Sequence, residues 1–116
     1  MATDKMFRTP ILPFTTYPLT LDVTDTSRVY SCMLMQSIEV FAKVTGAATG
    51  LIYLLKWLPE FSVWGVYRNP EIADPGRPGG ENHMAWTQDH NQSSYFALLV
   101  TGAVTVTRAS IQGVRY

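Results

Sequence analysis

Two histidines, each near an acidic residue, are the side chains of this sequence best suited to metal or acid–base chemistry. His83 has Glu81 close by, and His90 follows Asp89. Imidazole and carboxylate groups serve in both kinds of site. The spacing does not match two histidines one helical turn apart, and no cysteine joins them. The polar residues around the pair favour solvent-exposed loop histidines. We therefore expect no metal and no cofactor, and a small enzyme centred on this pair remains only a third hypothesis.

Other nucleophilic and phosphate-binding motifs are missing from the sequence. Cys32 is the only cysteine, and its apolar surroundings indicate a small buried hydrophobic residue rather than a reactive thiol. No G-x-S-x-G sequence occurs. Residues 76–80 are rich in glycine, but prolines flank and interrupt them, so they do not match a phosphate-binding loop. The sequence predicts a protein that is not an enzyme.

Aromatic side chains are the second group that could carry a function. They could form a stacking platform for sugar rings or the centre of a protein interface. They could also fill the core, because aromatic residues suit strands. We expect Trp57 and Trp64 to be mainly core residues, and Trp86, which follows a long loop, to be a contact residue. The other members of the group are Tyr53, Phe61, Tyr67, Tyr95 and Phe96.

Length and charge restrict the class of protein. A chain of 116 residues fits one domain, and its formal net charge is zero. The basic residues are not clustered, as binding to nucleic acid or to an anionic membrane would require. The most apolar stretch, 44–55, is too short to span a membrane, and no apolar signal-peptide segment follows the first residues. We expect a protein without a signal peptide that binds neither nucleic acid nor membrane.

Residues 1–18 are predicted to form an extended N-terminal arm. Prolines at positions 10, 13 and 18 argue against a helix and a central strand. Large apolar residues nevertheless occur here, which is unusual for a solvated disordered tail. The arm is therefore predicted to lie against an apolar surface, either of its own domain or of a neighbouring subunit. The predicted interface residues are Phe7, Ile11, Leu12 and Phe14, together with Trp86.

Residues 19–116 are predicted to fold into an all-β domain, an antiparallel β-sandwich of jelly-roll type. Alternation of apolar and polar residues indicates strands, and the apolar stretch 51–58 indicates a central one. Residues 46–50 are predicted to be a short connection, and 69–82, rich in proline and glycine, a long exposed loop without ladder or helix. Residues 30–44 could form a helix, but their β-branched side chains favour a strand. The predicted strands cover 19–24, 29–34, 38–45, 51–58, 61–67, 95–100 and 103–112, with a turn at Thr101 and Gly102.

Three stretches resemble a type of small β-sandwich found in phage particles, as capsid decoration (cement) proteins or head-fibre modules. Residues 37–46 (SIEVFAKVTG) are similar to a strand that ends in a V-x-G turn. Residues 49–55 (TGLIYLL) resemble its hairpin partner, which a tryptophan follows. Residues 95–113 resemble the closing pair of strands, in which Arg108 precedes an alternating strand and Gly113 ends it.

The resemblance implies a structural virion protein that binds and stabilises a phage capsid through subunit–subunit contacts. Its partners would be the major capsid protein or other virion proteins, and it would be a homo-oligomer, for example a trimer, with its arm across a neighbouring subunit. Many weak contacts would add through their effective concentration. The alternative is a carbohydrate-binding module or a receptor-binding domain of a tail or head fibre, with Trp86 on an exposed platform.

Overall fold

The computed structural model describes residues 4–8, 11–31, 35–67, 69–87 and 95–115 of the chain. These residues form strands, connecting turns and one short 3-10 helix, η1 (Pro78–Gly80), but no α-helix. The predicted all-β class is therefore confirmed. The strands are β1 (Asp4–Arg8), β2 (Val29–Ser31), β3 (Met35–Leu58), β4 (Val63–Val66), β5 (Glu71–Ala73), β6 (Glu81–Thr87) and β7 (Tyr95–Arg115).

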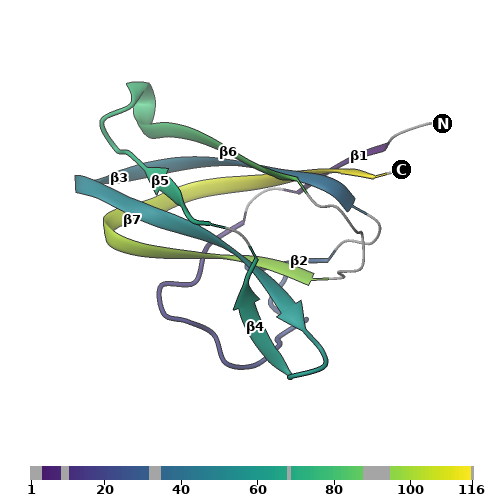
Figure 1. Cartoon of the computed structure of the whole chain (residues 1–116). Helices are drawn as coiled ribbons and strands as arrows, with labels where there is room; N and C mark the ends of the chain where they lie inside the picture. The colour runs from purple at the N-terminus through teal and green to yellow at the C-terminus, as the bar shows by residue number, and fades with distance from the viewer. Residues whose placement is uncertain (1–3, 9–10, 32–34, 68, 88–94, 116) are drawn as a thin grey trace.

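The two longest strands, β3 and β7, form the centre of a single seven-stranded sheet. They pair with each other along most of their length, in antiparallel orientation. The other side of β3 carries β6, β5 and β4 in succession, and the other side of β7 carries β1 and β2. The sheet curls into a half-barrel, so that the half with β1 and β6 lies over the half with β2 and β4 (Figure 1).

Both long strands bend at the same place, seen at the left of Figure 1. The register shifts there, because Gly46 pairs with Val104 while Gly50 pairs with Gly102, leaving 47–49 as a bulge in β3. A bulge of this kind sharpens the bend of a strand. Gly46 and Gly102 have φ values of +151° and +95°, and a Cβ on Gly50 would lie 2.4 Å from a carbonyl oxygen of β7. The corner therefore depends on glycine.

The connection predicted at residues 46–50 is wrong. The stretches on either side of it, 38–45 and 51–58, do not pair as a hairpin, since both belong to β3 and both pair with β7. Thr101 and Gly102, predicted as a turn, likewise lie inside β7. Glycine serves at bulges as well as at turns, so its position could not distinguish a corner in one long strand from the end of a strand.

The main core lies between the two halves of the curled sheet. Side chains at alternate positions of β3 and β7 point into it, as expected for strands with one face buried, and Ile11 from the N-terminal segment is also fully buried in it. Besides Ile11, the large side chains of this core that are almost completely buried are those of Ile38, Val40, Val44, Ile52, Leu54, Phe96, Leu98 and Ile111.

The outer face of the β2–β4 half carries a second, smaller apolar cluster. Trp64 of β4 is 1% exposed there, and its ring meets that of Trp57 edge to face at 5.6 Å. Leu55 is also buried in this cluster, while Leu54 beside it points into the main core. The prediction that 51–58 is a central strand, apolar on both faces, is confirmed. Of the two tryptophans expected to be mainly core residues, Trp64 is buried in this cluster, whereas Trp57 is only partly buried against it.

Residues 11–28 run along this half of the sheet and partly cover the second cluster, against which Phe14 packs. The N–H of Phe14 donates to the carbonyl oxygen of Leu98 at 2.7 Å, and its carbonyl accepts from the N–H of Val100 at 3.0 Å. Further towards the N-terminus, β1 pairs with the end of β7. The predicted arm therefore lies against its own sheet, which is one of the two surfaces that the sequence left open.

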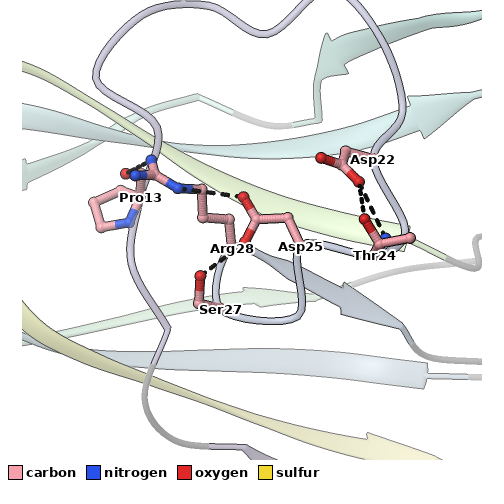
Figure 2. A network of polar contacts seen from close by, with 6 residues as sticks. All are labelled: Pro13, Asp22, Thr24, Asp25, Ser27 and Arg28. Atoms are coloured by element: carbon pink, nitrogen blue, oxygen red, sulfur yellow. Dashed lines mark hydrogen bonds and ion pairs between the residues drawn. The ribbon is translucent and has the colours of Figure 1, made fainter.

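We call residues 11–28 the covering segment. Arg28 connects the end of this segment to its start (Figure 2). Its guanidinium donates to the carbonyl oxygen of Pro13 at 3.1 Å and lies 3.4 Å from the carboxylate of Asp25. It also lies 5.5 Å from the centre of the Phe14 ring, in a cation–π contact. The hydroxyl of Ser27 donates to Asp25 at 2.7 Å. These contacts fix the segment as a closed loop.

The first predicted strand of the sandwich, 19–24, is wrong, because these residues form an irregular turn. The carboxylate of Asp22 accepts hydrogen bonds from the hydroxyl and the backbone N–H of Thr24, at 2.7 and 3.1 Å (Figure 2). The hydroxyl first, and then the N–H, hold the pKa of Asp22 below its ordinary value. Local bonds of this kind compete with strand pairing. The apolar alternation instead places Leu21 against the second cluster and leaves Leu19 exposed.

The long loop predicted over 69–82 is only partly correct, since strand β5 lies within it. β5 is bracketed by Pro70 and Pro75 and pairs with β3 alone among the described strands. A strand at the edge of a sheet tolerates nearby proline, because one of its sides needs no ladder. The prediction that proline and glycine leave no ladder or helix here is therefore wrong, because β5, the 3-10 helix η1 and the start of β6 all lie within 69–82.

β6 was also missed, because its alternation is interrupted by a buried polar residue. Asn82 is 2% exposed and Met84 is 3% exposed, so these two positions form the inward face of the strand. The Asn82 amide accepts from the N–H of Asp74 at 3.0 Å and donates to the carbonyl oxygens of Asp74 and Gly80, both at 3.1 Å. These bonds replace the water that the buried amide loses.

Candidate functional site

Exposed apolar side chains gather along one edge of the curled sheet. Ile72 of β5 and Val66 of β4 follow one another along β3, opposite Leu51 and Leu55, and they are 56% and 48% exposed. Because opposite residues share a face of the sheet, both stand on the face of the second cluster. Leu19 of the covering segment is 76% exposed. We call Leu19, Val66 and Ile72 the apolar edge.

The covering segment reaches the apolar edge from the other side. The hydroxyl of Tyr17 donates to the carbonyl oxygen of Trp64, and the indole N–H of Trp64 donates to the carbonyl oxygen of Thr20 at 3.1 Å. These bonds place Leu19 beside β4. The chain's own segment thus closes part of the apolar outer face, and the apolar edge continues that face into solvent. Surfaces of this kind are typical of contacts with another macromolecule.

A small hollow of about 210 Å³ lies next to the start of the covering segment. Leu12, which is 37% exposed, lines it together with Arg28 and the β7 residues Val104 and Val106. Ile11, its neighbour in sequence, is instead fully enclosed in the main core. Of these two predicted interface residues, only Leu12 presents its side chain on the surface of the chain.

The remaining predicted interface residues have different positions in the fold. Phe14 is half-buried between the second cluster and the guanidinium of Arg28. Phe7 lies in β1 opposite Gln112, and Trp86 lies in β6 opposite Ile38. The side chains of Phe7 and Trp86 are outside the part of the chain that the structure describes, so their predicted contact roles remain predictions.

His83, one of the two histidines considered for chemistry, lies on strand β6 rather than in a loop. Its ring stacks on that of Phe41 in β3, with 4.6 Å between centroids and 12° between planes. Its Nε2 lies 3.9 Å from Oε2 of Glu39. The expected exposure of His83 is confirmed, whereas the expected loop is wrong, because polar residues on the solvent face of an edge strand resemble a loop in composition.

The other candidates for chemistry lie outside the described part of the chain. They are Cys32, Asp89 and His90. Among the described residues, no group of three histidine, cysteine or acidic side chains lies close enough to hold a metal ion. The described residues likewise include no helix of the length and hydropathy needed to cross a membrane.

A groove of about 730 Å³ opens on the outer face of the half that contains β1 and β6. Phe41 stands in its middle, 43% exposed, with His83 opposite on β6 and Ser110 opposite on β7. One step along β3, Lys43 has Glu81 as its partner on β6. On β7 the partner of the lysine is Arg108, which also lines the groove.

Sequence reasoning placed Phe41 in a strand but did not single it out as a functional residue. The available signal was its position between Glu39 and Lys43, in a strand whose alternate positions, such as Val40 and Ala42, are apolar. An aromatic residue on the polar face of an alternating strand is an exception that calls for an explanation.

Comparison with known proteins does not assign a family to this fold. No protein-family model matches the chain, and no curated protein matches its sequence. The functional argument therefore rests on the two surfaces described above, the apolar edge and the groove at Phe41.

Proposed function

We propose that this protein is a structural component of a phage particle, a capsid decoration or head-fibre protein that associates with copies of itself and with the major capsid protein. Its curled sheet would then be a variant of the β-sandwich, or jelly-roll, of such proteins, and its place would be the virion. The observation that carries the proposal is the apolar edge, where an apolar sheet face continues into solvent.

The apolar edge offers exposed apolar side chains beside strands that have a free side within the described part of the chain, although the carbonyl of Trp64 in β4 already accepts from Tyr17. β4 and β5 each pair with β3 on one side, and neither has a second strand neighbour among the described residues. Strand edges with exposed apolar side chains are natural sites of association between chains. The net charge of zero adds little repulsion between copies. Self-association through this edge would bury Val66 and Ile72.

Oligomerisation would also explain how weak contacts hold the protein on a particle. Each copy presents the same surfaces, so an oligomer joined at the apolar edge can contact several capsid subunits at once. Binding of the second and third contacts is then intramolecular, and the overall affinity exceeds that of one contact by orders of magnitude, about 10²–10⁴. Loss of the oligomer is therefore expected to weaken attachment to the particle.

The test is particle association of the full chain with lysine in place of Ile72. The tagged chain is expressed in host cells while phage particles form. The particles are then purified on a density gradient. We expect the wild-type chain to migrate with the particles and Ile72→Lys to remain at the top. An ammonium buried without a partner in an apolar contact costs about 3 kcal/mol or more.

Thr45→Lys is the matched control, because Thr45 is an exposed β-branched residue of β3 that lies on the other side of the corner from the residues paired with β5. This variant is expected to migrate with the particles. A wild-type chain that never enters the particle fraction would overturn the proposal, and so would particle association of Ile72→Lys equal to that of the wild type.

Deletion of residues 1–16 would not be a clean test of the arm. Such a deletion removes Ile11 from the main core and Phe14 from the second cluster, so the domain itself would lose stability. The substitution Leu12→Lys changes only the exposed side chain beside the hollow. It tests whether the arm also contacts a neighbouring subunit, with the same gradient as the readout.

A further inference from the structure

The Phe41 ring has His83 stacked on one side, and it is nevertheless 43% exposed in the groove. His83 stacks on the side of Phe41 that faces β6, at 4.6 Å. On the side that faces β7, the residue opposite is Ser110, whose side chain is short. A serine beside a phenylalanine leaves space above the sheet for a flat group, with an aromatic face on one side and a hydroxyl on the other.

The rim of the groove has charged side chains of both signs. Lys43 and Arg108 line it as hydrogen-bond donors, and Glu81 lines it as an acceptor. Glu39, close to His83, adds a second carboxylate. With two acids and two bases around the ring of Phe41, neither sign dominates, so the rim does not select for an anionic or a cationic ligand. A neutral ligand rich in hydroxyl groups would find donors and acceptors on both sides.

We propose that the groove at Phe41 binds a neutral pyranose ring of a glycan. One face of such a sugar presents C–H groups, which pack on an aromatic ring, while its edges present hydroxyl groups. In this groove the C–H face lies on Phe41, and the hydroxyl groups meet Ser110 and the charged rim. Charged side chains form stronger hydrogen bonds than neutral ones, which fixes the orientation of the ring.

The groove is large enough to hold a sugar ring. Its volume of about 730 Å³ falls within the range of about 300–1,000 Å³ that small-molecule sites have. The buried residues Ala42 and Ala109 lie beneath it and belong to the main core, so two well-packed strands form its floor. A site with a rigid floor loses little conformational freedom on binding.

The experiment is an array of oligosaccharides that end in glucose, galactose, mannose or N-acetylglucosamine, with sialylated and sulfated oligosaccharides beside them, probed with the full chain. The strongest binder is then titrated by calorimetry into the wild type, Phe41→Ala and Phe41→Trp. We expect binding of a neutral oligosaccharide, an affinity loss of about tenfold or more in Phe41→Ala, and retention in Phe41→Trp. Ser110→Leu, which fills the space beside Phe41, is expected to reduce binding to a similar extent.

Phe61→Ala is the matched control, since Phe61 is a 71% exposed phenylalanine at the turn between β3 and β4, away from the groove. This variant is expected to bind the oligosaccharide as the wild type does. Thermal unfolding of each variant confirms that it is folded. No binding to any neutral oligosaccharide, binding to charged ones alone, or equal affinity in the wild type, Phe41→Ala and Ser110→Leu would overturn the proposal. Ile72→Lys leaves this site intact, so failure of glycan binding is distinguishable from failure of the assembly proposal.

Discussion

The side chain of Asn82 connects the turn between β5 and β6 to the sheet. This turn has no regular strand pairing of its own. Its side chain occupies a position on β6 that faces the main core, where an apolar residue would be expected, and it satisfies backbone groups of Asp74 and Gly80. The turn between β5 and β6 is thereby fixed without a ladder of its own. Local composition alone predicted a loop here, because the partners of a buried amide are not visible in a sequence.

Replacing Asn82 by alanine is expected to lower the free energy of unfolding by about 2 kcal/mol, because one buried and two partly buried backbone groups lose their partner. Urea denaturation followed by tryptophan fluorescence measures the change. Thr105→Ala, an exposed position on β7, serves as the control and should stay within about 0.5 kcal/mol of the wild type. Equal effects of the two substitutions would show that the amide does not stabilise the turn.

The groove at Phe41 is also a feature of single residues that the sequence could not bring together. Phe41 and His83 are far apart in the chain, and they meet only because β3 and β6 pair in the register that sets them opposite each other. Alternation predicted that Phe41 would be on the face opposite Val40 and Ala42. The neighbours of Phe41 on that face required the strand order.

At the scale of elements, the sequence predicted strands better than it predicted where strands end. Alternation and two-sided apolar character located 38–45, 51–58, 95–100 and 103–112 correctly as β-structure. Glycine then divided β3 and β7 into separate strands, although both continue through a corner. The distinction depends on which strand each half pairs with, and pairing partners are non-local.

The corner gives a prediction of its own. Gly50→Ala would place a methyl group 2.4 Å from both the carbonyl oxygen of Thr101 and Cγ2 of Val104, so the bulge must open. We expect a loss of about 2 kcal/mol or more in the free energy of unfolding, as for overpacked cores, measured by thermal and urea unfolding.

Gly76→Ala is the control for Gly50→Ala. At this exposed turn the added methyl would meet only the flexible carboxylate of Asp74, at 3.1 Å, and a change below about 0.5 kcal/mol is expected. If Gly50→Ala were as stable as Gly76→Ala, the two long strands would not meet as closely at the corner as described.

At the scale of the whole molecule, one curled sheet buries two apolar clusters. Its inner face encloses the main core, and its outer face is partly covered by the chain's own residues 11–28. The sequence indicated an apolar arm and a strand apolar on both faces, which together anticipate this cover. It could not show that the cover stops short of Val66 and Ile72, because that depends on how the turn at Asp22 and Thr24 directs the chain.

The apolar edge that remains is the basis of the assembly proposal, and the mass of the chain in solution tests it most directly. Light scattering after size-exclusion chromatography should give the wild type a mass that is a multiple of the 13.0 kDa of one chain. Ile72→Lys should give the mass of a single chain, with an unchanged circular dichroism spectrum. A single-chain mass for the wild type at every concentration, or an oligomer that Ile72→Lys leaves intact, would contradict the account.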